Sequence, residues 1–332
     1  MKKIPDNLLK QMAKAYDAEH ADLSYFRGGH DWSDGILYEY SRDGRTHILK
    51  IMELPAGQAQ ESLSALEARL QFIRFLGERG IGIVHPEPAA DGRLFVKEQE
   101  EERIYAAYGY IKRDGVHLFE RPVAEHEALF ARWGEVMGQM HAAAQEYPVW
   151  REIPGDQEHG ILHWEKEWHG FHEWCKDEAV KESWRRLKDK LDRLPLERGG
   201  FGFTHNDLHI ENLLANQGTV TVLDFDVSNL HWFACDLAVA VYSILTYASA
   251  GQIEGTPQDP GRLRQLYRSF IEGYLSANPL DDFWLAQIPL FLQYRRILLF
   301  VVFAEGLAQS DPEHYRLWRQ RILEETPFPN YN

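Results

Sequence analysis

The residues best suited to chemistry gather in one short segment, 202–226. Two apolar runs in it, Leu213–Ala215 and Thr219–Leu223, are typical of strands, and the Asn-Gln-Gly turn between them predicts a hairpin. Asn212 precedes the first run and Asp224 follows the second, so antiparallel pairing should bring these two side chains close together. An amide oxygen and a carboxylate suit Mg²⁺, a hard ion that proteins hold through a few oxygens and through phosphate. We therefore expect a site for a metal and a phosphate at this hairpin.

Asp207 adds a third oxygen-bearing side chain, five positions before Asn212, on the loop that enters the hairpin. From this loop its carboxylate could accept the proton of a substrate hydroxyl while the metal holds the phosphate. The three residues together are suited to phosphoryl transfer.

Two other interpretations use the same part of the chain. His205, Asp207 and His209 could form a metal triad with borderline ligands, although no further His or Cys stands at a convincing spacing. The run that ends at Asp224 and Asp226 also resembles the strand and Asp-x-Asp of haloacid-dehalogenase-like phosphatases, whose first Asp is a nucleophile. That motif normally opens a chain at a parallel sheet, whereas here a hairpin precedes it. Asp226 itself could be a second metal ligand or a structural carboxylate.

The elements expected before this segment are mostly strands. Four runs predict them: Gly35–Tyr40, Thr46–Met52, Arg93–Val96 and Ile104–Ile111. The turn 41–44 joins the first two into a hairpin, and the acidic run Glu98–Glu102 is typical of a solvated hairpin end. Between the two pairs, apolar residues at helical spacing from Leu63 to Gly77 predict one helix that ends at Gly80.

From Pro122 onward the pattern becomes helical. Long helices are predicted over His126–Glu146 and Lys181–Leu194, and helices resume from Phe233 to the end of the chain. We therefore expect an α+β fold with a small mostly-β N-terminal lobe, residues 1–111, and a larger mostly-helical C-terminal lobe, residues 112–332.

The combined motif over 205–238 resembles one known family. Its first part is His205-Asn206-Asp207-Leu208-His209-Ile210-Glu211-Asn212, and Leu223-Asp224 and Asp236-Leu237-Ala238 follow it. This is similar to the aminoglycoside phosphotransferase-like kinases, which include choline and homoserine kinases and share the bilobal protein-kinase-like fold. The resemblance implies ATP and Mg²⁺ as cofactors, a nucleotide-binding N-terminal lobe, and a catalytic and substrate-binding C-terminal lobe.

The resemblance also implies roles for the matching residues. Asp207 would be the catalytic base, and Asn212 and Asp224 would be the Mg²⁺ ligands. His205 would support the motif, and Asp236 would brace the catalytic loop.

Outside that segment the resemblance implies looser assignments. Lys50, in the run 47–51, looks like the strand lysine that grips the α- and β-phosphates. The segment 27–35 occupies the place of the loop that covers the nucleotide, and Tyr110 and Ile111 look like the hinge that meets adenine through its backbone. The residues of the covering loop expected to bind nucleotide are Gly28, Gly29 and Ser33.

One position departs from the family pattern. The family helix after the lysine strand carries a Glu that pairs with the lysine, and the corresponding position here is Arg69. Glu67, on the other flank of the apolar stripe, is either its substitute or a surface carboxylate.

The composition bounds the ligands and the location of the protein. With 36 Lys and Arg against 51 Asp and Glu, the 332-residue chain carries a net charge of −15, which argues against nucleic acid and anionic membranes as partners. The two cysteines form neither a disulfide framework nor a Cys-based zinc site. Because the first seven residues lack an apolar stretch and Ile297–Ala304 is too short to span a bilayer, we expect a soluble cytoplasmic protein.

A tryptophan-rich stretch, 164–174, bears on the acceptor. It mixes the rings of Trp164, Trp168 and Trp174 with the carboxylates of Glu165 and Glu173. Aromatic residues at helical spacing usually belong to a core, yet rings and carboxylates could also cage a cationic amine. The acidic composition leaves the same two interpretations, because it serves solubility as well as attraction of cations.

The sequence thus predicts an ATP- and Mg²⁺-dependent kinase whose acceptor is the hydroxyl of a small molecule, such as an amino alcohol, an aminoglycoside or a sugar. A protein Ser/Thr kinase of the same fold and a catalytically silent nucleotide-binding protein are the alternatives. The identity of the acceptor and the oligomeric state stay open.

Overall fold

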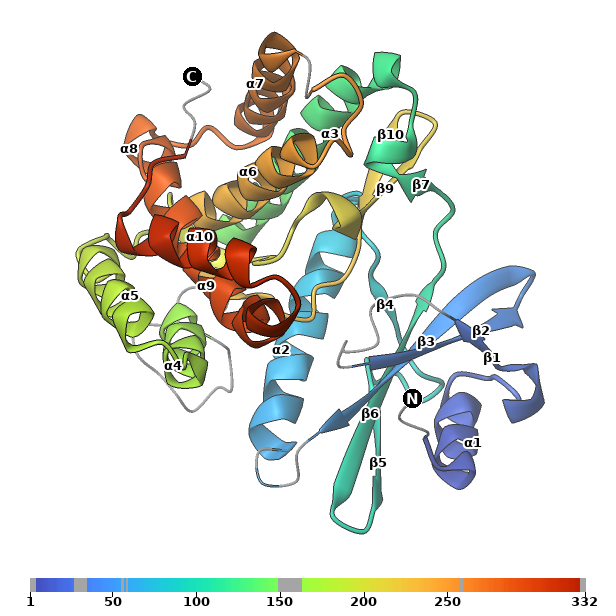
Figure 1. Cartoon of the computed structure of the whole chain (residues 1–332). Helices are drawn as coiled ribbons and strands as arrows, with labels where there is room; N and C mark the ends of the chain where they lie inside the picture. Colours follow the sequence, from blue (N-terminus) through green and yellow to red (C-terminus); the bar gives the residue numbers. More distant parts are fainter. Residues whose placement is uncertain are drawn as a thin grey trace. The chain divides into compact units, whose positions relative to one another are not determined.

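The computed structural model of the chain describes residues 4–26, 35–54, 57, 59–148, 163–256 and 259–328. These residues form two compact units (Figure 1). The first holds the described residues up to Gly115 and also the later segment Thr221–Asp226, and the second holds the remainder. A short stretch that contains Asp224 and Asp226 therefore belongs to the N-terminal unit.

The first unit is built on an antiparallel sheet. Its described strands are β1 (Ser24–Phe26), β2 (Gly35–Arg42), β3 (Arg45–Leu54), β4 (Pro86–Glu87), β5 (Val96–Glu100) and β6 (Arg103–Ile111). Their order is β1-β2-β3-β6-β4, with β5 also paired to β6. The predicted hairpin is confirmed, because β2 and β3 pair and are joined by Asp43 and Gly44, whose φ angles are +52° and +72°. Two residues with positive φ give the turn whose twist matches the flanking strands.

The strand predicted over Arg93–Val96 is displaced, because β5 begins at Val96 and runs to Glu100. The acidic residues were expected to form the hairpin end, but part of the run lies in the strand. In the described sheet β5 pairs only with β6, and an edge strand can turn charged side chains to solvent.

The first unit contains one helix that the sequence interpretation missed. The predicted helix is confirmed as α2 (Ala59–Glu78), which is followed by Gly80 at φ +72°. The missed helix is α1 (Asp6–Ala15), which buries Leu8, Leu9, Met12 and Ala13. These positions fall on one helical face, so the spacing held the signal. The helix packs in the core of the unit with residues of the sheet such as Leu49 and Tyr105.

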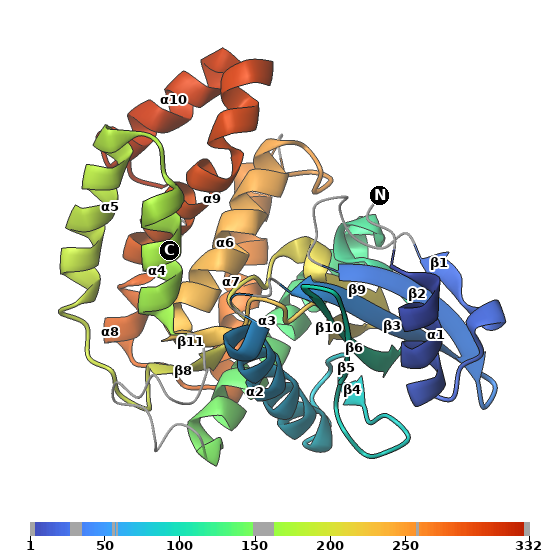
Figure 2. The same cartoon turned by 90° about the horizontal axis from the view of Figure 1, so that it is seen from below.

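The second unit is mostly helical, as predicted. Its described helices of the α type are α3 (Val123–Glu146), α4 (Trp164–Trp174), α5 (Glu178–Leu191), α6 (Phe233–Ser249), α7 (Pro260–Ala277), α8 (Asp282–Leu285), α9 (Ile288–Ser310) and α10 (Pro312–Leu323). Helices α4 and α5 lie side by side (Figure 2), and the indole N–H groups of Trp168 and Trp184 each donate to the other's backbone carbonyl.

Helices α3 and α7 approach each other closely because glycines stand at their contact. A Cβ added to Gly134 of α3 would lie 1.9 Å from the carbonyl oxygen of Phe270. A Cβ added to Gly273 of α7 would lie 2.0 Å from the carbonyl oxygen of Ala131. The two backbones therefore touch where the side chains are absent.

Helix α9 belongs to an apolar stretch longer than the sequence interpretation assumed. By length and composition alone, the helical stretch Asp282–Ser310 could cross a bilayer. Half of its most apolar window (50%) is buried inside the protein, and α9 packs against α6 within the second unit. This burial is typical of a core helix.

Short strands position the predicted catalytic loop. They are β7 (Val116–His117), β8 (Phe201–Thr204), β9 (Leu213–Asn216), β10 (Thr219–Val222) and β11 (Asn229–Trp232). All of them lie in the second unit except the end of β10, residues 221–222, which belongs to the first. Strand β8 pairs with β11, and the loop 205–212 follows β8 directly. The predicted hairpin of β9 and β10 is confirmed, with Gln217 and Gly218 at positive φ in its turn.

Candidate active site

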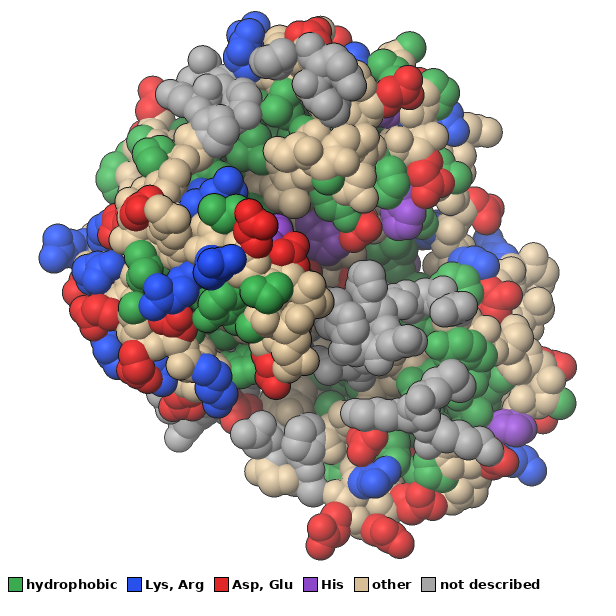
Figure 3. Space-filling model, in the orientation of Figure 1, with side chains coloured by type: hydrophobic (Ala, Val, Ile, Leu, Met, Phe, Trp, Pro, Cys, Tyr) green, Lys and Arg blue, Asp and Glu red, His purple; other side chains and the backbone are tan. Residues whose placement is uncertain are grey.

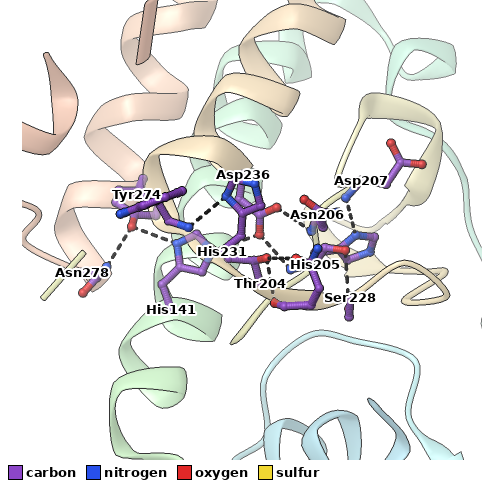
Figure 4. Close-up of polar contacts among 12 residues, drawn as sticks. His141, Thr204, His205, Asn206, Asp207, Ser228, His231, Asp236, Tyr274 and Asn278 are labelled. Atoms are coloured by element: carbon purple, nitrogen blue, oxygen red, sulfur yellow. Dashed lines mark hydrogen bonds and ion pairs between the residues drawn. The ribbon is translucent and has the colours of Figure 1, made fainter. Parts of the chain in front are cut away.

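Asp236 shapes the loop 205–212 in the second unit. Its buried carboxylate, in the first turn of α6, accepts the backbone N–H groups of His205 (2.8 Å) and Asn206 (2.6 Å) (Figure 4). Asn206 has a φ of +69°, a left-handed conformation that Asn tolerates better than most residues. A carboxylate that accepts two consecutive amides holds the backbone in this bend.

Asp236 is in turn oriented by a buried polar chain. Asp236 accepts a hydrogen bond from His141 Nε2 (3.0 Å), whose Nδ1 lies 2.9 Å from the hydroxyl of Tyr274. Asn278 Nδ2 donates to that hydroxyl at 2.8 Å. Burial alone would raise the pKa of the Asp236 carboxyl, but the His141 contacts and the His205 amide bring that pKa below its usual value. The carboxylate therefore stays charged and able to hold the loop.

Asp207, the predicted base, has a partner that the sequence interpretation missed. The Asp207 side chain is 31% exposed, and its Oδ1 accepts from the Nη2 of Arg295 on α9. Its Oδ2 lies 3.7 Å from Nε2 of His209. Arg295 is only 12% exposed, so the ion pair is partly shielded from water. An arginine inside the apolar sequence of α9 was the signal that could have indicated this residue.

Glu167 of α4 is a second residue that the sequence interpretation missed. Its carboxylate accepts from Asn206 Nδ2, from Asn229 Nδ2 at 3.2 Å and from the Tyr294 hydroxyl at 2.7 Å. Burial raises the pKa of the Glu167 carboxyl, although the hydrogen bonds from Tyr294 and Asn206 act in the opposite direction. Glu167 thus connects α4 and α9 to the catalytic loop.

Asn212, a predicted metal ligand, is fixed by the same loop. Its Nδ2 donates to the backbone carbonyl of Asp207 at 2.9 Å. Among the described residues its Oδ1 accepts no hydrogen bond, so this hard oxygen fits a divalent cation.

The alternative metal triad is not formed. Within the described ranges, no three His, Cys, Asp or Glu side chains are placed to hold a metal ion. His205 Nδ1 instead lies 3.3 Å from the Asp207 backbone N–H, and His209 Nδ1 lies 3.3 Å from that of Glu211.

In the first unit, the structure brings Lys50 together with the residues after β10. The Lys50 side chain of β3 is buried, and its Nζ lies 3.2 Å from Asp224 Oδ1 and also pairs with Asp226 Oδ2. The Tyr108 hydroxyl donates to Asp226 Oδ1 at 3.1 Å. Burial alone would lower the pKa of Lys50, but the charges of Asp226 and Asp224 raise that pKa well above its usual value. Lys50 therefore stays protonated. About half of the Asp224 side chain is exposed, and its carboxylate fits a metal ion.

Of the other sequence-predicted residues of this unit, Tyr110 neighbours the cluster, with its ring 6.2 Å from that of Tyr108, and Glu67 does not join it. Glu67 is exposed on α2, where it accepts from Gln71 Nε2 at 3.4 Å, so the structure does not bring it to Lys50. Tyr110 and Ile111 end β6, and burial raises the pKa of Tyr110 to about 12. Three predicted residues lie outside the described part of the chain: Gly28, Gly29 and Ser33.

The tryptophan-rich stretch supports a core role more than a cation cage. Trp164 and Trp168 are buried, and Lys188 Nζ lies 5.1 Å and 5.6 Å from the centres of their rings. Glu165 lies 3.6 Å from the same ammonium group. The chain's own lysine thus takes the place that a cationic ligand was expected to fill.

On the face shown in Figure 3, acidic and basic side chains are interspersed over the second unit.

Comparison with known proteins gives one family and several relatives. The chain matches the model of the "Phosphotransferase enzyme family" over residues 30–275. It is 26% identical over 314 residues to an amicoumacin kinase of Bacillus subtilis (strain 168), covering 90% of this chain and 88% of the relative. An uncharacterized protein of Deinococcus radiodurans is 25% identical over 248 residues, covering 74% of this chain and 68% of that protein.

Solved structures show the same fold. The amicoumacin kinase hAmiN, solved with AMP-PNP, Ca²⁺ and Ami, superposes with a TM-score of 0.83 at 24% identity, covering 98% of this chain and 95% of that one. A microcompartment-associated aminopropanol kinase gives a TM-score of 0.65 at 20% identity, with 96% and 94% covered. The spectinomycin phosphotransferase APH(9)-Ia gives 0.55 at 17% identity, with 100% and 97% covered. The predicted protein-kinase-like fold is thereby confirmed.

Proposed function

Since the chain belongs to the phosphotransferase enzyme family, as its motifs predicted, we propose that it transfers the γ-phosphoryl group of ATP, with Mg²⁺, to a hydroxyl group of a small molecule. The observation that carries the proposal is the coexistence of two arrangements. One is the loop with Asp207 and Asn212 in the second unit, and the other is the Lys50 cluster with Asp224 in the first.

The Lys50 cluster supports a role in binding nucleotide. Lys50 keeps its charge, and a buried ammonium group beside two carboxylates is placed to share its hydrogen bonds with phosphate oxygens. We assign the metal to Asn212 Oδ1 and Asp224, which provide one amide and one carboxylate oxygen. Mg²⁺ bound there would neutralise charge on the phosphate oxygens.

Asp207 performs the proton transfer in this proposal. Its carboxylate accepts the proton of the acceptor hydroxyl as the acceptor oxygen forms a bond to the γ-phosphorus. The bond from that phosphorus to the bridging oxygen of ADP breaks at the same time, and ADP leaves with the electron pair. The partial exposure of Asp207 is consistent with this role, because an acceptor must reach its oxygens.

For the acceptor we propose a compound that carries both amino and hydroxyl groups. An aminopropanol kinase and a spectinomycin phosphotransferase among the similar structures support this acceptor class, as does the net charge of −15. Trp164 and Trp168 do not support it, because their rings face Lys188. We place the enzyme in the cytoplasm, with no nucleic acid or membrane partner.

The proposal is tested by incubating purified protein with Mg-ATP and a panel of acceptors while ADP release is followed. The panel contains amino alcohols, aminoglycosides, neutral sugars and amicoumacin, together with a Ser/Thr peptide. We expect ADP release and a phosphorylated product with at least one amino-hydroxyl compound. Phosphorylation of the peptide alone would favour a protein kinase, and binding of ATP without any transfer would favour a silent nucleotide-binding protein.

A further inference from the structure

The contact between Arg295 and Asp207 places a cation of a distant helix on the predicted base. The two residues are 88 positions apart, and the guanidinium reaches one carboxylate oxygen, Oδ1. Oδ2 has a weaker neighbour, His209 Nε2 at 3.7 Å, which is beyond hydrogen-bonding distance. The two oxygens of Asp207 are therefore not equivalent.

Arg295 is held in place by its neighbour on α9. Tyr294 is buried and donates to Glu167 at 2.7 Å, and Glu167 also accepts from the side chain of Asn206. Two consecutive residues of α9 thus engage two consecutive residues of the catalytic loop, Tyr294 through Glu167 and Arg295 directly. This double contact fixes both the backbone beside Asp207 and the rotation of its carboxylate.

We propose that Arg295 is the positioning residue of the catalytic base, an inference that rests on the proposed function above. Its guanidinium holds Oδ1 of Asp207, so that Oδ2 is the oxygen that accepts the proton of the acceptor hydroxyl. A carboxylate without this contact rotates about its terminal bond and presents the proton-accepting oxygen for only part of the time. Positioning of this kind acts on the rate of transfer and leaves the binding of nucleotide unchanged.

The shape of the guanidinium suits this task better than an ammonium group. Its planar N–H groups fix direction as well as distance, whereas an ammonium group supplies charge with freely rotating donors. Arg295→Lys should therefore retain part of the function and Arg295→Met should lose it.

The test compares the turnover of four Arg295 forms: wild type, Arg295→Lys, Arg295→Met and Arg295→Ala. The acceptors are aminopropanol, spectinomycin and amicoumacin, after which the relatives are named. If the enzyme phosphorylates none of these compounds, the hydrolysis of Mg-ATP, in which water is the acceptor, is measured instead. We expect kcat to fall by about 10- to 100-fold in Arg295→Met, with the KM for ATP within about twofold and a smaller fall in Arg295→Lys. Added guanidinium at millimolar concentration should raise the kcat of Arg295→Ala and not that of the wild type.

Arg296→Met is the matched control on the same helix. Arg296 is buried, somewhat more deeply than Arg295, and donates to the carbonyl of Thr326 at 2.6 Å and to Gln293 at 2.9 Å, away from the loop. This variant should lose thermal stability and keep its kcat per folded molecule. A purely structural role of Arg295 would give the same result in Arg295→Met.

Two outcomes overturn the inference. Turnover of Arg295→Met that equals or exceeds that of the wild type would mean that the ion pair is dispensable or competes with the acceptor. A fall that neither lysine nor guanidinium relieves would mean that Arg295 does not act through its contact with Asp207. Asp207→Ala separates a failure of this inference from a failure of the proposed function. If Asp207→Ala loses turnover and the Arg295 variants do not, the proposed function stands and only the role of Arg295 is overturned.

Discussion

At the scale of single residues, the pairing of Lys50 is the clearest departure from the family pattern. The family lysine is expected to pair with a Glu of the following helix, whereas Lys50 here pairs with Asp226 and Asp224. Tyr108 donates to Asp226, so that carboxylate is itself oriented. Asp226 therefore occupies the place that the sequence interpretation considered for Glu67. This observation favours the structural role of Asp226 over the role of a second metal ligand.

Substitution of Asp226 and of Glu67 tests whether Asp226 is the carboxylate that orients Lys50. We expect Asp226→Asn to raise the KM for ATP by about tenfold or more, because Lys50 loses a charged partner that orients it. Glu67→Gln is the control and should stay within about twofold of the wild type, since Glu67 is exposed and contacts Gln71 rather than Lys50. Steady-state kinetics with varied ATP measures both. A larger effect of Glu67→Gln than of Asp226→Asn would restore the family pairing.

A second substitution tests the proposed metal ligand. Asp224→Asn removes the formal charge of the proposed metal pair and should weaken binding of Mg-ATP by at least about tenfold. Calorimetric titration with Mg-ATP gives the affinity, and a titration with ATP in EDTA is the control that should change less. Unchanged Mg-ATP binding would assign the metal to other residues.

The sequence predicted the loop residues of the site better than their partners. Asp207, Asn212 and Asp224 are recognisable because they lie within 18 positions and repeat a family spacing. Arg295 and Glu167 are 88 and 39 positions from the loop residues that they contact, and although an arginine in an apolar helix stands out, the sequence does not show which residue it contacts. Only the fold brings them to the loop.

At the scale of helices and strands, local chemistry decided which predictions succeeded. The hairpins around Asp43-Gly44 and Gln217-Gly218 were recognisable because their turns need residues that tolerate positive φ. The displaced strand β5 was not, because the charges of an edge strand hide the apolar alternation on which the prediction relied. Helix α1 was missed although its buried residues have helical spacing.

The close contact of α3 and α7 leads to a prediction about two glycines. In a free helix, Gly→Ala stabilises by up to about 1 kcal/mol. Gly134→Ala should instead lower the free energy of unfolding by about 2 kcal/mol or more, because its Cβ would meet the Phe270 carbonyl at 1.9 Å. Gly306→Ala on α9 is the control, since a Cβ there meets no atom within 4 Å, and it should stabilise slightly. Urea unfolding measures both, and equal effects of the two substitutions would contradict the backbone contact.

At the scale of the whole molecule, buried histidines predict how stability depends on pH. His231 is buried on β11, its Nδ1 lies 3.0 Å from the Trp232 backbone N–H, and its Nε2 has no hydrogen-bond partner among the described residues. Burial lowers the pKa of His231 from 6.5 to about 3. Burial also lowers the pKa of four other histidines: His126, His163, His172 and His209.

The sign of the effect follows from proton binding. Below pH 6.5 the unfolded chain takes up a proton at His231, and the folded protein does so only near pH 3. The contribution of His231 to stability is therefore complete above pH 6.5 and is lost as the pH falls toward 3. This residue alone should lower the free energy of unfolding by about 2 kcal/mol between pH 8 and pH 5.

Urea unfolding at pH 8 and pH 5 measures the difference for the wild type and for His231→Asn. The amide oxygen of Asn can replace Nδ1 as the acceptor for Trp232, but Asn does not titrate. The variant should start less stable and lose about 2 kcal/mol less between the two pH values. An equal loss in both proteins would show that His231 takes up its proton in the folded state.

The activity of the whole molecule depends on the central claim, that this phosphotransferase uses Asp207 as the base for an acceptor hydroxyl. The most direct test measures acceptor-dependent ADP release and Mg-ATP affinity in the wild type and in Asp207→Ala. We predict that Asp207→Ala lowers kcat by at least about 100-fold and keeps the Kd for Mg-ATP within about threefold, because Asp207 acts on the acceptor and not on the nucleotide. Near-normal turnover of Asp207→Ala on an acceptor that the wild type phosphorylates would contradict the account.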